Sequence, residues 1–308
     1  MSRIDCHAHV LPPAYREALG DWPIPQARVT DLEAMMERHQ IDAAVISVGP
    51  PGAFTGDPAR APELARLAND GIAEVVRGAP SRFAGLATLP LPSLDAALSE
   101  LARALDELSL DGVMLLSSVA GTYLGDLRWQ PLFAELDRRG AYVFVHPGFP
   151  AYPLPLEHPV WLYEFPLETV RAITNLIYTG TMERYPCIRI QLAHLGGAAP
   201  FLAHRIASLA EREPEKAAEA PAGALAYLRR VYYDTGLANN RAALAATLEV
   251  VSPEQIVFGT DWPYLALPTA SRDPAPELDS LGAQQRADLE GANPARLVPR
   301  LVEALKLA

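Results

Sequence analysis

Eight short apolar runs alternate with longer amphipathic segments along this chain, and this alternation constrains its fold more than any other feature. Each run has the length of a single strand, and each intervening segment carries apolar residues at helical spacing. The predicted strands cover residues 4–9, 43–49, 83–90, 112–117, 142–146, 188–194, 231–235 and 256–261. The predicted helices lie near residues 30–40, 58–78, 93–109, 128–139, 165–184, 199–211 and 240–250, with C-terminal helices near 276–290 and 293–305. About eight strand–helix units in succession predict an α/β fold, the parallel (β/α)8 TIM barrel.

The length and charge of the chain limit its organisation and its partners. A length of 308 residues suits one such barrel, and we expect a single domain over residues 1–308. The net charge of −11 argues against nucleic acid or an anionic membrane as a partner, because both require a basic surface. Two cysteines and the lack of a signal-like or membrane-spanning run lead us to expect a cytoplasmic protein.

Two connections are longer than the tight loops that usually join a strand to its helix. They cover residues 10–27 after the first predicted strand and 147–163 after the fifth. Both leave the C-terminal ends of strands, where barrels build their active sites. Both carry aromatic residues, and we expect Trp22 and Tyr152 to act as lid residues over a substrate. A rigid surface loop is the alternative for each connection.

Two histidines stand at the end of the first predicted strand. His7 and His9 are two residues apart, and side chains at that spacing point to the same face of a strand. Their imidazoles are therefore expected to converge at the C-terminal end of the strand. Such a pair can arise by accident, and it gains meaning only if other strands end on residues of the same kind.

Three other predicted strands do end on such residues. His146, His194 and Asp261 close the fifth, sixth and eighth strands, and a turn follows each of them. In a parallel barrel these ends share one rim, so we expect the three side chains to meet His7 and His9. Neutral imidazoles and a carboxylate suit zinc, manganese or iron(II) and leave an open position for water or substrate. The sequence therefore predicts a divalent metal site at this rim.

Several motifs resemble a known family. The segments IDCHAH (4–9), VHP (145–147), LAHLGG (192–197) and FGTDWP (258–263) resemble the amidohydrolase superfamily. Within it, they resemble the branch of metal-dependent decarboxylases typified by aminocarboxymuconate-semialdehyde decarboxylase. The similarity covers nearly the whole chain, including NPARL (293–297). Other segments are similar to 6-methylsalicylate decarboxylase-like members, namely LPPAY (11–15), ATLPLP (87–92), YLGD (123–126) and YYDT (232–235).

The resemblance implies a role for each rim residue. It implies that His7, His9, His146 and Asp261 bind the metal and that His194 is a catalytic residue close to it. The family usually forms homodimers or larger homo-oligomers, so the resemblance implies the same assembly here.

Two departures from the pattern of the superfamily bear on the mechanism. Many hydrolases of the superfamily carry a carboxylated lysine on the fourth strand, which bridges two metals, whereas residues 112–117 contain no lysine. We therefore expect one divalent ion, either zinc or manganese. Some aromatic-acid decarboxylases of this branch carry a glutamate three residues after the histidine of the sixth strand. Gly197 occupies that position here, so the path that supplies the proton stays open.

The leading hypothesis is a non-oxidative decarboxylase of a small aromatic acid, such as a 2-hydroxybenzoate or 6-methylsalicylate, or of an enol-type carboxylic acid. An ortho-hydroxybenzoate can bind a metal through its carboxylate and hydroxyl, which would orient the ring without an arginine. Asp261 would shuttle a proton to the carbon that bears the carboxylate, and His194 would orient the substrate or stabilise charge. No organic cofactor is needed, and no glycine-rich nucleotide fingerprint surrounds Gly196 and Gly197.

Two alternatives use the same residues. A metal-dependent hydrolase could attack a lactone, an amide or a carbon–carbon bond with a metal-bound water, with Asp261 as base and His194 polarising the carbonyl. A non-catalytic metal-binding scaffold is the other alternative, and it would require ligands without an accessible pocket.

If the protein binds a flat ring, aromatic residues near the strand ends would wall the pocket. The expected substrate contacts are Trp22, Phe54, Trp161, Phe165 and Tyr264.

Overall fold

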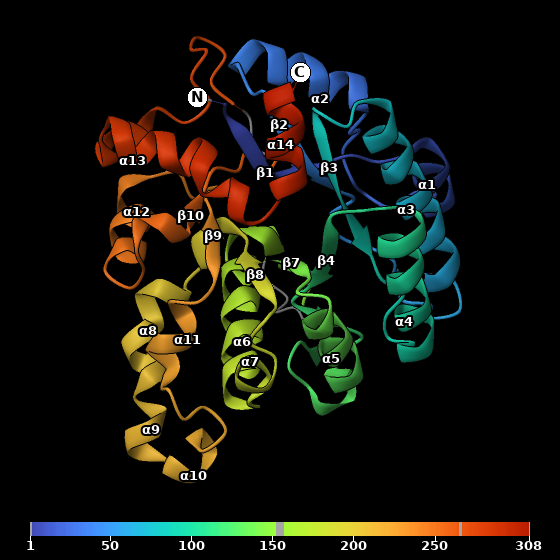
Figure 1. The fold of residues 1–308 in the computed structure, drawn as a ribbon. Coiled ribbons are helices and arrows are strands. Elements are labelled where there is room, and N and C mark those ends of the chain that lie inside the picture. The colour runs from blue at the N-terminus through green and yellow to red at the C-terminus, as the bar shows by residue number, and fades with distance from the viewer. Residues whose placement is uncertain (1, 152–156, 265–266, 308) are drawn as a thin grey trace.

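Eight parallel strands surround the core in the computed structural model, which describes residues 2–151, 157–264 and 267–307 (Figure 1). Each strand pairs with its neighbour in the order β1-β2-β3-β4-β7-β8-β9-β10. Their bounds are β1 (Ile4–His9), β2 (Ala43–Ser47), β3 (Phe83–Thr88), β4 (Gly112–Leu116), β7 (Tyr142–His146), β8 (Arg189–Leu192), β9 (Tyr232–Asp234) and β10 (Ile256–Val257). The predicted (β/α)8 barrel is confirmed.

The barrel closes through the segment that follows β10, because β10 itself is only two residues long. The backbone N–H of Cys6 donates to the carbonyl of Phe258 at 2.8 Å, and the N–H of His9 donates to that of Trp262 at 2.8 Å. Ala8 and Trp262 form a parallel bridge. The first strand is therefore held against the last segment of the barrel at the level of its two histidines.

Six of the eight predicted strands are shorter in the structure, and two of these end before the residue that we expected in the site. The run 188–194 is a strand only to Leu192, and His194 opens the 3-10 turn η4 (His194–Gly196). The run 256–261 leaves the strand after Val257. The backbone turns at both residues that we expected in the site, because His194 has a φ of 57° and Asp261 a φ of 58°. Non-glycine residues rarely adopt this left-handed conformation, and it is often found at functional sites.

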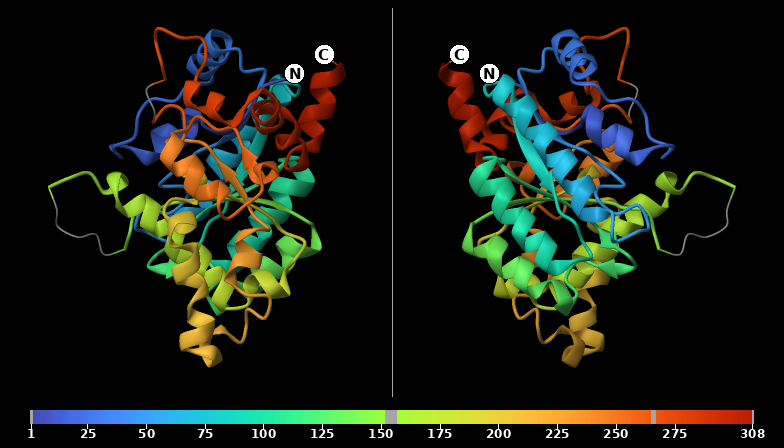
Figure 2. Two further views of the ribbon diagram at one scale, coloured as in Figure 1. Left: turned by 90° about the vertical axis from the view of Figure 1, so that its left-hand side faces the viewer. Right: turned by 90° about the vertical axis from the view of Figure 1, so that its right-hand side faces the viewer.

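Helices cover the outside of the strands, as Figures 1 and 2 show. Helix α3 (Ala61–Gly78) illustrates why they form, since Leu64, Ala65, Ala68 and Ile72 are buried along one helical face. The longer helices are α2 (Val29–His39), α3 (Ala61–Gly78), α4 (Leu94–Ala102), α5 (Gln130–Arg138), α6 (Glu164–Tyr178), α8 (Ala199–Ala207), α12 (Arg241–Leu248) and α14 (Pro299–Leu307). The shorter ones are α1 (Pro13–Leu19), α7 (Thr181–Arg184), α9 (Leu209–Arg212), α10 (Pro214–Ala217), α11 (Ala224–Leu228) and α13 (Ala283–Ala287). Both views place α9 and α10 away from the barrel.

Some predicted helices and loops differ in detail from the structure. The segment 165–184 is divided into α6 and α7, because Gly180 has a φ of 70° and ends the regular helix. The long connection after β1 contains a helix of its own, α1. The connection after β7 ends in the 3-10 turn η3 (Val160–Leu162), which leads directly into α6.

Large buried side chains fill the interior of the barrel below the C-terminal ends of the strands. Tyr142 and Phe144 are among the largest fully buried side chains, and both come from β7. The ring of Phe144 lies 4.7 Å from the ring of His7, between centroids.

None of the helices that the structure describes is long and apolar enough to span a lipid bilayer.

Candidate metal centre

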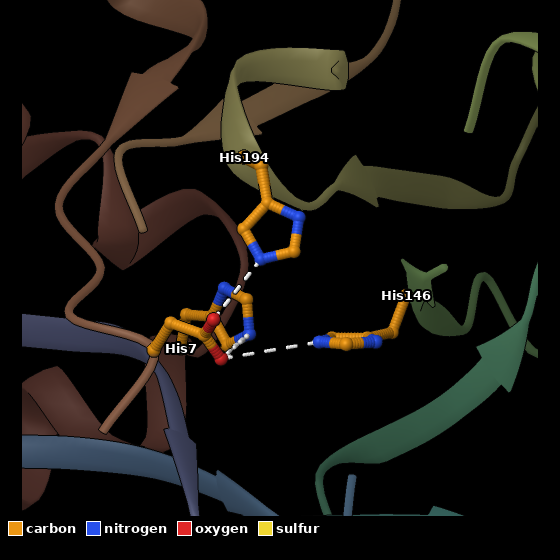
Figure 3. A group of neighbouring side chains, drawn as sticks. His7, His146 and His194 are labelled. Atoms are coloured by element: carbon orange, nitrogen blue, oxygen red, sulfur yellow. Dashed lines mark hydrogen bonds and ion pairs between the residues drawn. The ribbon is translucent and has the colours of Figure 1, made fainter. Parts of the chain in front are cut away.

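Four buried side chains meet at the C-terminal ends of the strands, as Figure 3 shows for the three histidines. His7, His146, His194 and Asp261 each offer one ligand atom, and these atoms lie within 4.8 Å of one another. They come from β1, from β7, from turn η4 after β8 and from the segment after β10. The parallel strands thus gather residues that are up to 254 positions apart in the sequence.

His9 joins the same cluster. Its Nε2 lies 3.1 Å from Nε2 of His7 and 3.1 Å from Oδ1 of Asp261. Oδ1 of Asp261 also lies 3.0 Å from Nε2 of His7 and 3.9 Å from Nε2 of His146. The structure therefore brings together all five side chains that the strand ends predicted.

The other ring nitrogen of each of three imidazoles is occupied, which fixes its orientation. Nδ1 of His7 lies 2.9 Å from Oδ1 of Asp234, and Nδ1 of His9 lies 3.0 Å from Oγ of Ser47. Nδ1 of His146 donates to the carbonyl of Pro147 at 2.8 Å. Contacts of this kind select the tautomer and aim the free Nε2 at the centre of the cluster, as they do around protein-bound metals.

The cluster has the properties of a divalent metal site. Nε2 of His146 is buried and has no hydrogen-bond partner among the described residues, and an unpaired buried nitrogen is unfavourable. The Nε2 atoms of His7 and His9 lie 3.1 Å apart, where a cation could lie between them. Imidazoles and one carboxylate are ligands that zinc, manganese and iron(II) accept. The residues present therefore fit a divalent metal.

Charge is distributed unevenly over the cluster. Burial acts to lower the pKa of His7, but the carboxylates of Asp234 and Asp261 outweigh it and raise the pKa to about 10. Burial lowers the pKa of His9, and it lowers the pKa of His146 to about 3. Although burial opposes it, the neighbouring histidines hold the pKa of Asp261 well below its usual range. Without a metal, the imidazole of His7 is thus positively charged opposite an ionised Asp261.

Aromatic rings lie beside two of the histidines. Phe165 lies 6.5 Å from His146, and Tyr264 lies 5.5 Å from His9, both between ring centroids. Both were expected substrate contacts, and the structure places them next to the cluster. Trp161 lies in turn η3, and 56% of its surface is exposed. Tyr152 lies outside the described residues.

A cavity of about 440 Å³ opens at the same end of the barrel. Its walls come from the segments that follow β1, β2, β4 and β7. Trp22 and Phe54, two further expected substrate contacts, are among the residues that line it. Sequence reasoning did not select Phe149 as a contact, yet Phe149 also lines this cavity and lies 5.6 Å from Phe165.

The family follows from a match over most of the chain. Residues 4–300 match the Amidohydro_2 family, whose description is amidohydrolase. The chain belongs to this amidohydrolase family. It is 32% identical over 276 residues to a 6-methylsalicylic acid decarboxylase of Penicillium expansum, covering 85% of each protein. The resemblance seen in the sequence motifs is thereby confirmed.

Solved structures agree with the assignment of this chain to the amidohydrolase family. A crystal structure of an amidohydrolase II superposes with a TM-score of 0.85 at 27% identity, covering 97% of this chain and 100% of the other. The dihydroxybenzoic acid decarboxylase of Polaromonas sp., determined with bound manganese and the inhibitor 2-nitroresorcinol, superposes with a TM-score of 0.81. At 23% identity and 97% coverage of both chains, the latter supports the shared fold.

Two residues that orient the histidines of this amidohydrolase were not selected from the sequence. Asp234 is buried; its carboxylate contacts His7 and also accepts from Nε2 of Gln191 at 2.7 Å. Ser47, which is also buried, contacts His9. Asp234 ends β9 and Ser47 ends β2, so each stands at the position that revealed the other site residues. Polar residues at the ends of these two strands were the available signal.

The structure also explains why Gly197 replaces the glutamate found in some decarboxylases of this branch. Gly197 has a φ of 60°, which a side chain rarely permits. A Cβ atom there would lie 2.5 Å from the carbonyl oxygen of Pro166 and 2.7 Å from its Cα. No larger side chain fits, so this amidohydrolase cannot deliver a proton from a residue at that position.

Substitution of Gly197 by alanine is therefore expected to destabilise the fold. The backbone conformation should cost about 1–3 kcal/mol, and the clash with Pro166 should add a similar amount. Gly282→Ala is the matched control, because Gly282 has a φ of 79° but a Cβ atom added there would meet no other atom within 4 Å. Chemical denaturation should show a larger loss for Gly197→Ala, and equal losses would contradict the packing argument.

Proposed function

We propose that this amidohydrolase is a metal-dependent, non-oxidative decarboxylase of aromatic carboxylic acids, with 2-hydroxybenzoates as its substrates. The observation that carries the proposal is the position of Asp261 between two sets of histidines. Its Oδ1 faces the Nε2 atoms of His7 and His9, whereas its Oδ2 lies 3.2 Å from Nε2 of His194. One carboxylate can thus take part in metal binding on one side and in proton transfer on the other.

His7, His9, His146 and Asp261 would hold one divalent ion, with zinc and manganese as the candidates. When bound, such an ion supplies Lewis acidity and a template for a carboxylate and its ortho-hydroxyl group. Two observations support a single ion. Strand β4 (Gly112–Leu116) contains no lysine that could be carboxylated to bridge a second one, and His194 faces the far oxygen of Asp261.

The proposed substrate needs no arginine to hold its carboxylate. This agrees with the position of Arg189, the arginine of strand β8. Arg189 lies at the start of β8, at the opposite end of that strand from His194. Its guanidinium donates to the carbonyls of Gly140, Arg296 and Leu297. Arg189 therefore holds the C-terminal part of the chain and is not available to a substrate.

Asp261 and His194 would provide the proton that decarboxylation requires. A proton held between Oδ2 of Asp261 and Nε2 of His194 moves to the ring carbon that bears the carboxylate. The bond between that carbon and the carboxylate then breaks, its electron pair returns to the ring, and CO2 leaves with the phenol as the other product. His194 is 7% exposed, which allows the pair to regain a proton from solvent. Positioned groups of this kind contribute about 10²–10⁴-fold.

The strand-end residues also keep the pair in place. The backbone N–H of His194 donates to Oδ1 of Asp234 at 3.2 Å, and the backbone N–H of Asp261 donates to the carbonyl of His7 at 2.8 Å. Both bonds anchor positive-φ residues whose backbone would otherwise relax. Catalytic groups fixed in this way do not need to reorganise during the reaction.

Production of CO2 tests the proposed function. The metal-free protein and the protein loaded with zinc or manganese are incubated with 2-hydroxybenzoates, including 6-methylsalicylate, and with lactone and ester controls. Metal-dependent release of CO2 from one of the acids is the expected result. Turnover of a lactone or ester without CO2 from any acid would overturn the proposal and assign the same residues to a hydrolase.

Metal affinity is expected to rise with pH. Because the pKa of His7 is about 10 without a metal, its imidazole carries a proton at neutral pH that a metal must displace. His9 and His146 have lowered pKa values and are already neutral, so about one proton should leave. The association constant should then increase about tenfold per pH unit between about pH 6.5 and 8.5. Competition with a chelator measures it, and an association constant independent of pH would contradict the assignment of His7.

A further inference from the structure

A row of neighbouring aromatic rings connects the 440 Å³ cavity to the metal centre. Trp22 lies 6.3 Å from Phe149, Phe149 lies 5.6 Å from Phe165, and Phe165 lies 6.5 Å from His146, all between ring centroids. Leu116, which also lines the cavity, is the register partner of His146 across β4 and β7. A ring bound at the histidines would therefore have this cavity as its neighbour.

The described walls of the cavity carry no charged side chain. Trp22, Phe54, Leu116, Val119 and Phe149 supply most of the side-chain bulk, together with small residues and prolines. The volume falls in the range of small-molecule pockets, which are mostly apolar with a few polar groups. Removal of an apolar group from water into such a cavity lowers the free energy. An ionised group would lose its hydration there without gaining a partner of opposite charge.

One polar group in the wall works against an anion. Oγ of Ser118 lies 3.3 Å from Oε2 of Glu168, a fully buried glutamate of α6. The carboxylate of Glu168 also accepts from Oγ of Ser117 and from the hydroxyl of Tyr123. Arg171 pairs with Glu168 at 2.7 Å, so that its cation is already engaged. A second carboxylate on the substrate would thus meet a carboxylate behind the wall and no free cation among the described residues that line it.

We propose that this cavity receives an uncharged, apolar substituent of the substrate ring, larger than a methyl group, and rejects ring substituents that carry a negative charge. The inference rests on the proposed decarboxylase function, since it assigns the ring to the histidine cluster. It narrows the substrates to 2-hydroxybenzoates with a single carboxylate and an alkyl or similar apolar group.

Pairs of acids that differ in one substituent test this selectivity. The metal-loaded protein is given 2-hydroxybenzoates bearing either a propyl group or a carboxylate at ring position 4, 5 or 6. At one position or more, kcat/KM for the propyl acid should match or exceed that for unsubstituted 2-hydroxybenzoate. The carboxylate at the same position should lower kcat/KM by at least about 100-fold. Comparable turnover of both acids at every position, or rejection of all propyl acids, would overturn the inference.

A positive charge introduced into the cavity wall tests whether this cavity causes the selectivity. Thr55 is half-buried in the lining, and Thr55→Arg offers a cation there, while Thr55→Gln adds length without charge. Relative to the propyl acid, turnover of the carboxylate acid should rise about tenfold or more in Thr55→Arg and stay unchanged in Thr55→Gln. An unchanged ratio in folded Thr55→Arg would show that the substituent lies elsewhere. CO2 release from none of the acids would instead signal failure of the proposed function.

Discussion

Replacement of His146 by alanine is expected to lower metal affinity by at least about 100-fold and to reduce CO2 release to background. His146 is the clearest ligand of the cluster, because its Nε2 is buried without a hydrogen-bond partner among the described residues while its Nδ1 donates to Pro147. Loss of a partner that only orients a ligand typically costs about 10–100-fold in affinity, and loss of the ligand itself should cost more. Metal content after dialysis and the rate of CO2 release are the two measurements.

His204→Ala is the matched control for that experiment. His204 lies in α8, and its side chain is exposed, so the same substitution removes an imidazole from outside the cluster. It should retain the metal and the activity of the unchanged protein. Full metal content and activity in folded His146→Ala would refute the assignment of His146 as a ligand.

Replacement of His194 by alanine should differ from that of His146 in metal content, with the metal retained and kcat reduced by about 10²–10⁴-fold. The reason is the geometry at Asp261, since Nε2 of His194 faces Oδ2, whereas His7 and His9 face Oδ1. The ligand atom of His194 still lies within 4.8 Å of those of His7, His146 and Asp261, so distance alone does not separate the roles. Metal content and kcat must therefore be measured on the same sample.

Two results of the His194→Ala experiment would contradict the proposed role of His194, and they have different meanings. If His194→Ala loses the metal as His146→Ala does, His194 is a ligand, and the proton must come from another group. If kcat is unchanged while the metal is retained, His194 takes no part in the reaction. His194→Gln provides a comparison, because the glutamine side chain can hydrogen-bond to Asp261 but cannot take up a proton in the way an imidazole does.

Much of the barrel and the cluster could be predicted from the sequence, for a simple physical reason. Parallel strands of a barrel end at one rim, so a polar residue at the end of each apolar run is also placed in space. His146 shows this most clearly, because it ends both the predicted and the observed strand. His194 and Asp261 were brought to the cluster although their strands end earlier, because left-handed turns redirect the backbone at both residues.

The supporting contacts were harder to predict, because they depend on which strands lie side by side in space. Asp234 and His7 are 227 residues apart, and no local pattern couples them. The reason for Gly197 was also hidden in the sequence, since the obstacle is the backbone of Pro166 on another segment. The cavity wall is likewise assembled from four connections, of which the sequence indicated Trp22 and Phe54 but not Phe149.

The measurement that tests the central claim most directly is a titration of the metal-free protein with manganese, followed by CO2 release from its best 2-hydroxybenzoate. If His7, His9, His146 and Asp261 hold one catalytic ion, the rate should rise linearly and stop rising at one metal per chain. A rate that continues to rise to two metals per chain would contradict the single-ion site. CO2 release at full rate without added metal, from protein shown to contain none, would contradict a metal-dependent mechanism altogether.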